Sequence, residues 1–258
     1  MRDFLTLDAR ILSLALARMV SAPANSFLVV VLPLYIGSQA VRLPAITGST
    51  VTAFGIGIGV SVELLIAIVL SLFGFLNSLS QPLTGSVSDR TGRRKPFLLF
   101  GLGLVATGSA GYLIFTDYVL VLAMRGLQGV GAAFSIPIAV ALVNELSDPS
   151  ERGNNFGLFN TFRLLGFGTG PLVAGVVVAG GPYALAGRPV SGFDAAFLIA
   201  VVGAAASFAL VSVLIADPEP TEAASEDVSI RIRGEEGGLD PVFALALATI
   251  VMALSIAV

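Results

Sequence analysis

Long apolar runs alternate along this chain with short polar segments. Residues 64–88, 96–116, 195–216 and 241–258 contain no charged residue, and 11–36, 118–144 and 153–181 each contain a single arginine. A helix needs about 20 apolar residues to cross the hydrocarbon core of a bilayer. Runs of this length could also be buried helices of a soluble protein, but here they fill nearly the whole chain. The pattern therefore predicts an all-α integral membrane protein.

The distribution of Lys and Arg decides how these spans are oriented. Residues 43–62 are also uncharged and could form a further span. Cytoplasmic loops collect basic residues, so the basic N-terminus and the basic segment 90–95 should lie on the same side, with two spans between them. We therefore expect 37–55 to be an outer loop, together with 182–193. The expected spans are 11–36, 59–84, 96–116, 118–144, 154–180 and 194–216.

This topology places the N-terminus in the cytoplasm and divides the chain into three parts. Nine basic residues fall on the inner side and two, Arg42 and Arg188, on the outer side. Residues 1–216 are expected to form a six-helix bundle and 217–240 a cytoplasmic linker. Residues 241–258 are expected to begin a seventh span. The linker carries eight acidic and two basic residues.

Composition excludes several kinds of chemistry. Only 12% of the residues are charged, against about 25% in ordinary soluble domains. The chain has no Cys and no His, which excludes disulfides, Cys/His metal sites and catalysis by a thiol or an imidazole. We expect no metal, no cofactor and no enzymatic activity. The chain has no basic arm of the kind that would indicate nucleic acid as a partner.

A compact motif lies in the segment expected between spans two and three. It consists of Gly85, three residues, Asp89-Arg90, one residue, and Gly92-Arg93-Arg94. Gly85 and Gly92 are suited to tight turns. Asp89 can accept hydrogen bonds at a helix start or pair with a neighbouring arginine. The basic residues can anchor the loop at anionic headgroups.

Two further motifs follow in order. Span four contains Arg125 and Gln128-Gly129, and span five contains Gly166, Gly170-Pro171 and Gly175. Gly166 and Gly170 share a helix face and allow close helix approach. With the segment at 85–94, these motifs resemble the signature loop, the span-four motif and the antiporter span-five motif of the major facilitator superfamily. The resemblance implies the N-terminal six-helix half of that fold, built from two three-helix repeats, with gating roles for the loop and the helix-five motif.

Ionisable residues inside spans are functional candidates because each costs several kcal/mol in hydrocarbon. Arg18 shares a helix face with Asn25, Arg125 with Gln128, and Asn160 with Arg163. We expect these six residues to line a substrate or proton pathway. Arg18 could instead snorkel to the interface, and Arg125 could bond structurally to carbonyls. Glu63, near the outer mouth, is either a proton carrier or a solvated rim acid.

The resemblance implies secondary transport of a small molecule by alternating access, with a proton gradient as coupling and efflux as the direction. The expected location is the cell membrane, and the expected partners are the lipid bilayer, the substrate and a C-terminal half of the transporter. Because the chain corresponds to half of such a protein, a truncated, non-transporting fragment is the main alternative. Uptake or facilitated transport of an organic anion or a sugar is a further one.

Overall fold

The computed structural model describes residues 9–53 and 56–216 and places six long helices among them. Residues 1–8, the linker 217–240 and the segment 241–258 expected to start a seventh span lie outside the described residues. The helices are α1 Ala9–Gly37, α2 Val62–Thr91, α3 Lys95–Gly111, α4 Tyr118–Leu146, α5 Arg152–Gly180 and α6 Gly192–Leu214.

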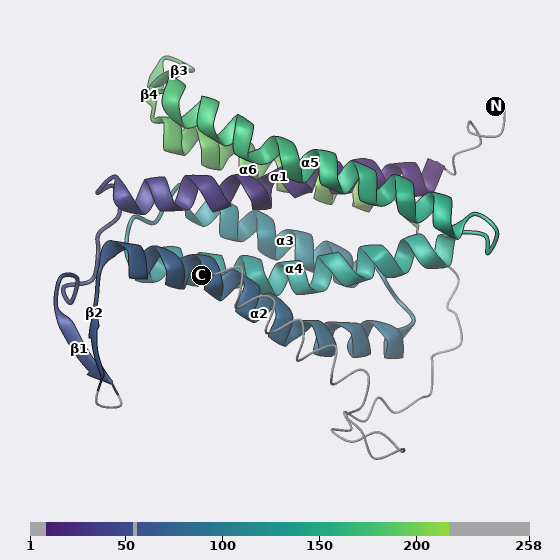
Figure 1. Ribbon diagram of the computed structural model, residues 1–258. Coiled ribbons are helices and arrows are strands. Elements are labelled where there is room, and N and C mark those ends of the chain that lie inside the picture. The colour runs from purple at the N-terminus through teal and green to yellow at the C-terminus, as the bar shows by residue number, and fades with distance from the viewer. Residues whose placement is uncertain (1–8, 54–55, 217–258) are drawn as a thin grey trace.

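The helices run up and down in one bundle with α1 and α4 in its interior (Figure 1). α1 packs most extensively against α5 and α6, and α4 against α2 and α3. Each of these contacts therefore joins one of the first three helices to one of the last three. α2 and α5 are left on the flanks and are much less buried than α1 and α4.

Five of the six described helices are long and apolar enough to cross a membrane, and α3 is the exception. The expected third span, 96–116, ends early because α3 stops at Gly111 after 17 residues. The chain then leaves the helix to pair with the segment after α1: the Arg42 N–H donates to the Thr116 carbonyl at 2.7 Å, and the Tyr118 N–H to the Arg42 carbonyl at 3.1 Å. These bonds satisfy backbone groups that a longer α3 would have used internally.

The segments expected on the outer side carry two short hairpins. β1 (Thr50–Ala53) pairs antiparallel with β2 (Ile56–Gly59), and β3 (Tyr183–Leu185) with β4 (Arg188–Val190). Part of the segment expected to be loop is therefore strand, and α2 begins three residues later than expected. Ser61 caps its start by accepting a hydrogen bond from the Leu64 N–H at 3.2 Å.

Small residues let α3 and α4 approach closely. A Cβ added at Gly101 would lie 2.6 Å from the Gly131 carbonyl oxygen, and one at Gly131 would lie 2.7 Å from the Gly101 carbonyl oxygen. Only glycine allows two backbones this close. The contact brings the two helix backbones together along the α3–α4 interface.

The bundle yields a direct test of orientation. Both hairpins lie at one end, and the turns at 92–94 and 147–151 at the other (Figure 1). Ser49 and Ser150 are exposed at these opposite ends, and the chain has no native cysteine. We predict that Ser49→Cys reacts with an impermeant maleimide on intact cells. Ser150→Cys should react only after permeabilisation, because basic loops face the cytoplasm.

The paired design controls for expression and for reagent access. Labelling of Ser150→Cys, but not Ser49→Cys, on intact cells would invert the topology. Labelling of both positions would mean that the chain is not inserted in one orientation.

Candidate functional site

The motif at 85–94 is helical for most of its length, contrary to the expectation of a loop. α2 continues through Thr91, so that Gly85, Asp89 and Arg90 lie on its last turns. The expected tight turn at Gly85 is wrong because this residue is helical, and a Cβ there would meet nothing within 4 Å. Gly92 does end the helix, with a positive φ of 62°, a conformation that favours glycine.

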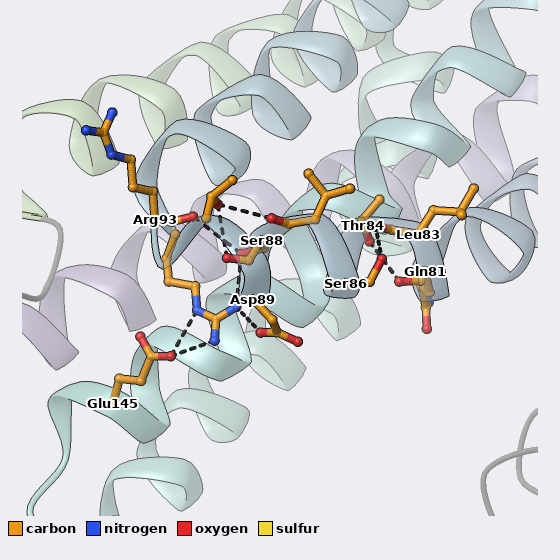
Figure 2. A network of polar contacts seen from close by, with 11 residues as sticks. Gln81, Leu83, Thr84, Ser86, Ser88, Asp89, Arg93 and Glu145 are labelled. Atoms are coloured by element: carbon orange, nitrogen blue, oxygen red, sulfur yellow. Dashed lines mark hydrogen bonds and ion pairs between the residues drawn. The ribbon is translucent and has the colours of Figure 1, made fainter. Parts of the chain in front are cut away.

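Arg94 joins the end of α2 to the end of α4. Its Nε and Nη2 donate to Glu145 Oε1 at 2.9 and 2.7 Å, and its Nη1 donates to Ser88 Oγ at 3.0 Å and also to Asp89. Figure 2 shows Asp89 and Glu145 at the two sides of this network. Asp89 thus pairs with a neighbouring arginine, one of its two expected roles, and not with a helix start. The side chains of Arg90 and Arg93 are exposed.

The network keeps Arg94 charged. Burial lowers the pKa of its guanidinium, but the hydrogen bonds and the negative charges of Glu145 and Asp89 outweigh burial and raise the pKa above its ordinary value. The three side chains are only partly shielded from solvent. The network therefore fixes geometry between two helix ends more than it adds stability.

A second polar cluster is buried between α2, α3 and α4 around Arg125. Arg125 is 2% exposed, and its Nη1 donates to Gln128 Oε1 at 3.1 Å. The Tyr112 hydroxyl donates to the same oxygen at 3.0 Å, while Gln128 Nε2 donates to Ser109 Oγ at 3.0 Å. The guanidinium carbon lies 4.3 Å from the centre of the Phe73 ring, within the range of a cation–π contact.

The partners of Arg125 come from other helices than expected. We expected Arg125 to line one pathway with residues of α1 and α5, but in the structure Phe73 of α2 covers its guanidinium and Gln128 links it to the end of α3. The side chain of Asn25 is not among those that the structure describes. Sequence reasoning missed Tyr112, Ser109 and Phe73 because nothing marks a polar residue of one span as the partner of another span.

Arg18, Asn160 and Arg163 meet in a cavity between α1, α4 and α5. The cavity has a volume of about 210 Å³ and is otherwise lined by apolar side chains, among them Ile136 and Phe159. Arg163 Nε donates to Asn160 Oδ1 at 2.9 Å. The sequence paired Asn160 with Arg163 and assigned Arg18 to the same pathway, but it did not show which helices would bring the three side chains together.

The helix-five motif divides into packed and open positions. Gly166 and Gly170 are buried, and a Cβ at Gly166 would clash with the Met19 carbonyl oxygen of α1. Pro171 lies inside α5, directly after the buried Gly170. A Cβ at Gly175 would meet nothing within 4 Å. Gly166, the first glycine of the motif, therefore lies at the α1–α5 contact.

One expected position, Glu63, stays apart from these clusters, and so does a polar pair on α2. Glu63 is exposed in the first turn of α2. Gln81 Nε2 donates to Asn77 Oδ1 at 3.3 Å along α2. Among the described residues, no group of three or more His, Cys, Asp or Glu could hold a metal ion.

Comparison with known proteins gives a consistent family. The sequence model of the Major Facilitator Superfamily matches residues 14–257. Citrate exporter 1 of Aspergillus niger is 32% identical over 113 residues, which cover 43% of this chain and 21% of that protein. The multidrug transporter AQR1 of Candida glabrata is 28% identical over 169 residues, which cover 66% of this chain and 26% of that protein.

Two solved structures share the fold. The human organic anion transporter MFSD10 aligns with a TM-score of 0.58 and 21% identity, over 79% of this chain and 46% of that chain. A peptide transporter, POT, solved in complex with sulfate, aligns with a TM-score of 0.62 and 16% identity, over 98% of this chain and 45% of that chain. This chain thus spans less than half the length of the transporters it matches.

The packed and open glycines of α5 give a matched pair of variants. We predict that Gly166→Ala lowers the free energy of unfolding by about 1–3 kcal/mol, the usual cost of overpacking. Gly168→Ala, where a Cβ meets nothing within 4 Å, should be neutral or slightly stabilising because alanine favours helix. Thermal unfolding of both variants in detergent measures this, and equal stability of the two would contradict the proposed α1–α5 contact.

Proposed function

Because this chain belongs to the major facilitator superfamily, we propose that it acts in secondary active transport of a small molecule, as a proton-coupled exporter working by alternating access. We propose the proton as the coupling ion. The proposed location of the protein is the cell membrane, with the N-terminus in the cytoplasm. Relatives named as exporters or multidrug transporters support the direction.

The observation that carries the proposal is the cavity of Arg18, Asn160 and Arg163. Arg18 lies nine residues into α1 and Arg163 eleven into α5, about 14 and 16 Å along their helices at 1.5 Å per residue. Both helices begin at the same end of the bundle. A polar, ionisable cavity at this depth in a membrane bundle is a binding site by default.

The flanking helices supply the surface on which a second half would rock. Large side chains on α2 and α5 are more than half exposed, for example Phe75 at 62% and Leu172 at 72%. We propose that lipid and a second six-helix half cover these faces. Arg94 would then act as a gating contact, because it joins Asp89 of α2 to Glu145 of α4.

A second candidate function is that of a half that does not transport alone. One observation favours it: the chain covers 45–46% of the solved transporters that it matches. A binding site at the face of one half needs the other half to close over it. The two candidates differ in whether this chain by itself moves substrate.

A flux assay separates these candidates. Proteoliposomes are loaded with a pH-sensitive dye, and uptake of benzenesulfonate and of ethidium is followed with and without a pH gradient. The assay is run on this chain and on a form that carries a second six-helix half. We expect gradient-dependent flux that is coupled to proton movement. Flux only from the longer form supports the second candidate, and no flux from either form contradicts transport.

The same assay tests the gating contact. Asp89→Asn should reduce flux per inserted molecule several-fold while the amount inserted falls little, since losing one partner of Arg94 shifts a conformational equilibrium. Arg188→Gln, an exposed position on β4, is the matched control. Equal losses of inserted protein and of flux would assign Asp89 to folding instead.

A further inference from the structure

We propose that the cavity between α1, α4 and α5 binds a small organic anion that carries an apolar group, with Arg18 and Arg163 as its two cationic contacts. This inference rests on the proposed transport function and names its substrate class. The three arginines that lie within the spans differ in their surroundings.

Arg125 is already committed to the protein. It is 2% exposed, bonded to Gln128 and stacked on Phe73. Arg18 and Arg163 differ, because both line an open cavity. Among the described residues, the guanidinium of Arg18 makes no hydrogen bond or ion pair, and that of Arg163 makes one, through Nε to Asn160.

The charge of the cavity is uncompensated by its walls. Both arginines line the same cavity, where two like charges repel each other, and no carboxylate is among the described residues that line it. Arginine within a membrane span is costly even alone, and two like charges in a low dielectric add to that cost. An anion between them removes the repulsion and accepts charge-assisted hydrogen bonds from both.

The other residues that line the cavity determine which kind of group the anion can carry. Apart from Asn160, the walls between the arginines are aliphatic and aromatic, including Ile136 and Phe159. The volume of about 210 Å³ is many times the roughly 10–15 Å³ that a cavity needs to hold one water. The cavity therefore suits a carboxylate or sulfonate attached to a compact apolar group. It does not suit an organic cation, which both arginines would repel.

Direct binding to the whole chain tests this assignment. The purified chain in lipid nanodiscs is titrated calorimetrically with benzenesulfonate and with benzenesulfonamide, a neutral molecule of nearly the same shape. We expect benzenesulfonate to bind at least tenfold more tightly. Equal affinity for the two, or no binding of benzenesulfonate, would overturn the proposal without any need for a variant.

Substitutions then locate the site. Arg18→Gln and Arg163→Gln should each weaken benzenesulfonate binding at least tenfold, and Arg163→Lys should restore part of it because the charge remains. Arg188→Gln is the control and should bind as the unmodified chain does. Circular dichroism and gel filtration verify that each variant is folded. Binding that is unchanged in both Gln variants would place the anion elsewhere and overturn the proposal.

The outcome is separable from that of the transport proposal. Arginine-dependent binding without flux would uphold the anion site and contradict transport by this chain. Flux that does not depend on Arg18 or Arg163 would uphold transport and overturn the anion site.

Discussion

The structure depends on one constraint: a charge inside a bilayer must find its partners within the protein, because hydrocarbon offers none. Arg125 meets this constraint in part through Gln128, which accepts hydrogen bonds from Arg125 Nη1 and from Tyr112 and donates one to Ser109. The buried Nε of Arg125 has no hydrogen-bond partner among the described residues. Gln128 thereby connects α4 to α3, and Phe73 of α2 covers the guanidinium. Gly108 of α3 lies directly against Gln128, since a Cβ there would be 2.6 Å from Gln128 Cγ, and this close approach lets the Gln128 amide reach Ser109.

The same constraint gives the other cations different roles. Arg94, at the helix ends, is neutralised by Asp89 and Glu145 and holds two helices in a fixed relation. Arg18 and Arg163 share a cavity whose described lining residues include no carboxylate. An arginine whose partners belong to the protein stabilises one conformation of the bundle. An arginine that faces a cavity can instead bind an anionic ligand. On this account the first group of arginines sets the shape of the bundle and the second group sets what it binds.

The sequence was sufficient to predict where most helices lie along the chain, but not which helices and side chains contact one another. Apolar runs and the Lys/Arg distribution predicted all-α architecture and most helix positions, because span length and loop charge are local properties. They did not predict that α2 runs through Asp89 or that α3 stops at Gly111. An apolar run marks only the part of a helix inside the bilayer, whereas α2 continues until the positive φ of Gly92 ends it, and the segment after α3 pairs through its backbone with Arg42. Helix periodicity likewise paired Asn160 with Arg163, but only the packing of α1 on α5 brings Arg18 to them.

The central claim is that Gln128 connects α3 and α4 through its buried hydrogen bonds, and a double-mutant cycle tests it most directly. The free energy of unfolding in mixed micelles is measured for Tyr112→Phe, Gln128→Leu and the double variant. Tyr112→Phe removes one hydroxyl and leaves the ring in place. The account predicts a coupling energy between about 0.6 and 1.7 kcal/mol, the range from average to strongest for hydrogen bonds between membrane helices. Strictly additive effects would contradict it, because they would mean that Tyr112 and Gln128 contribute to stability independently.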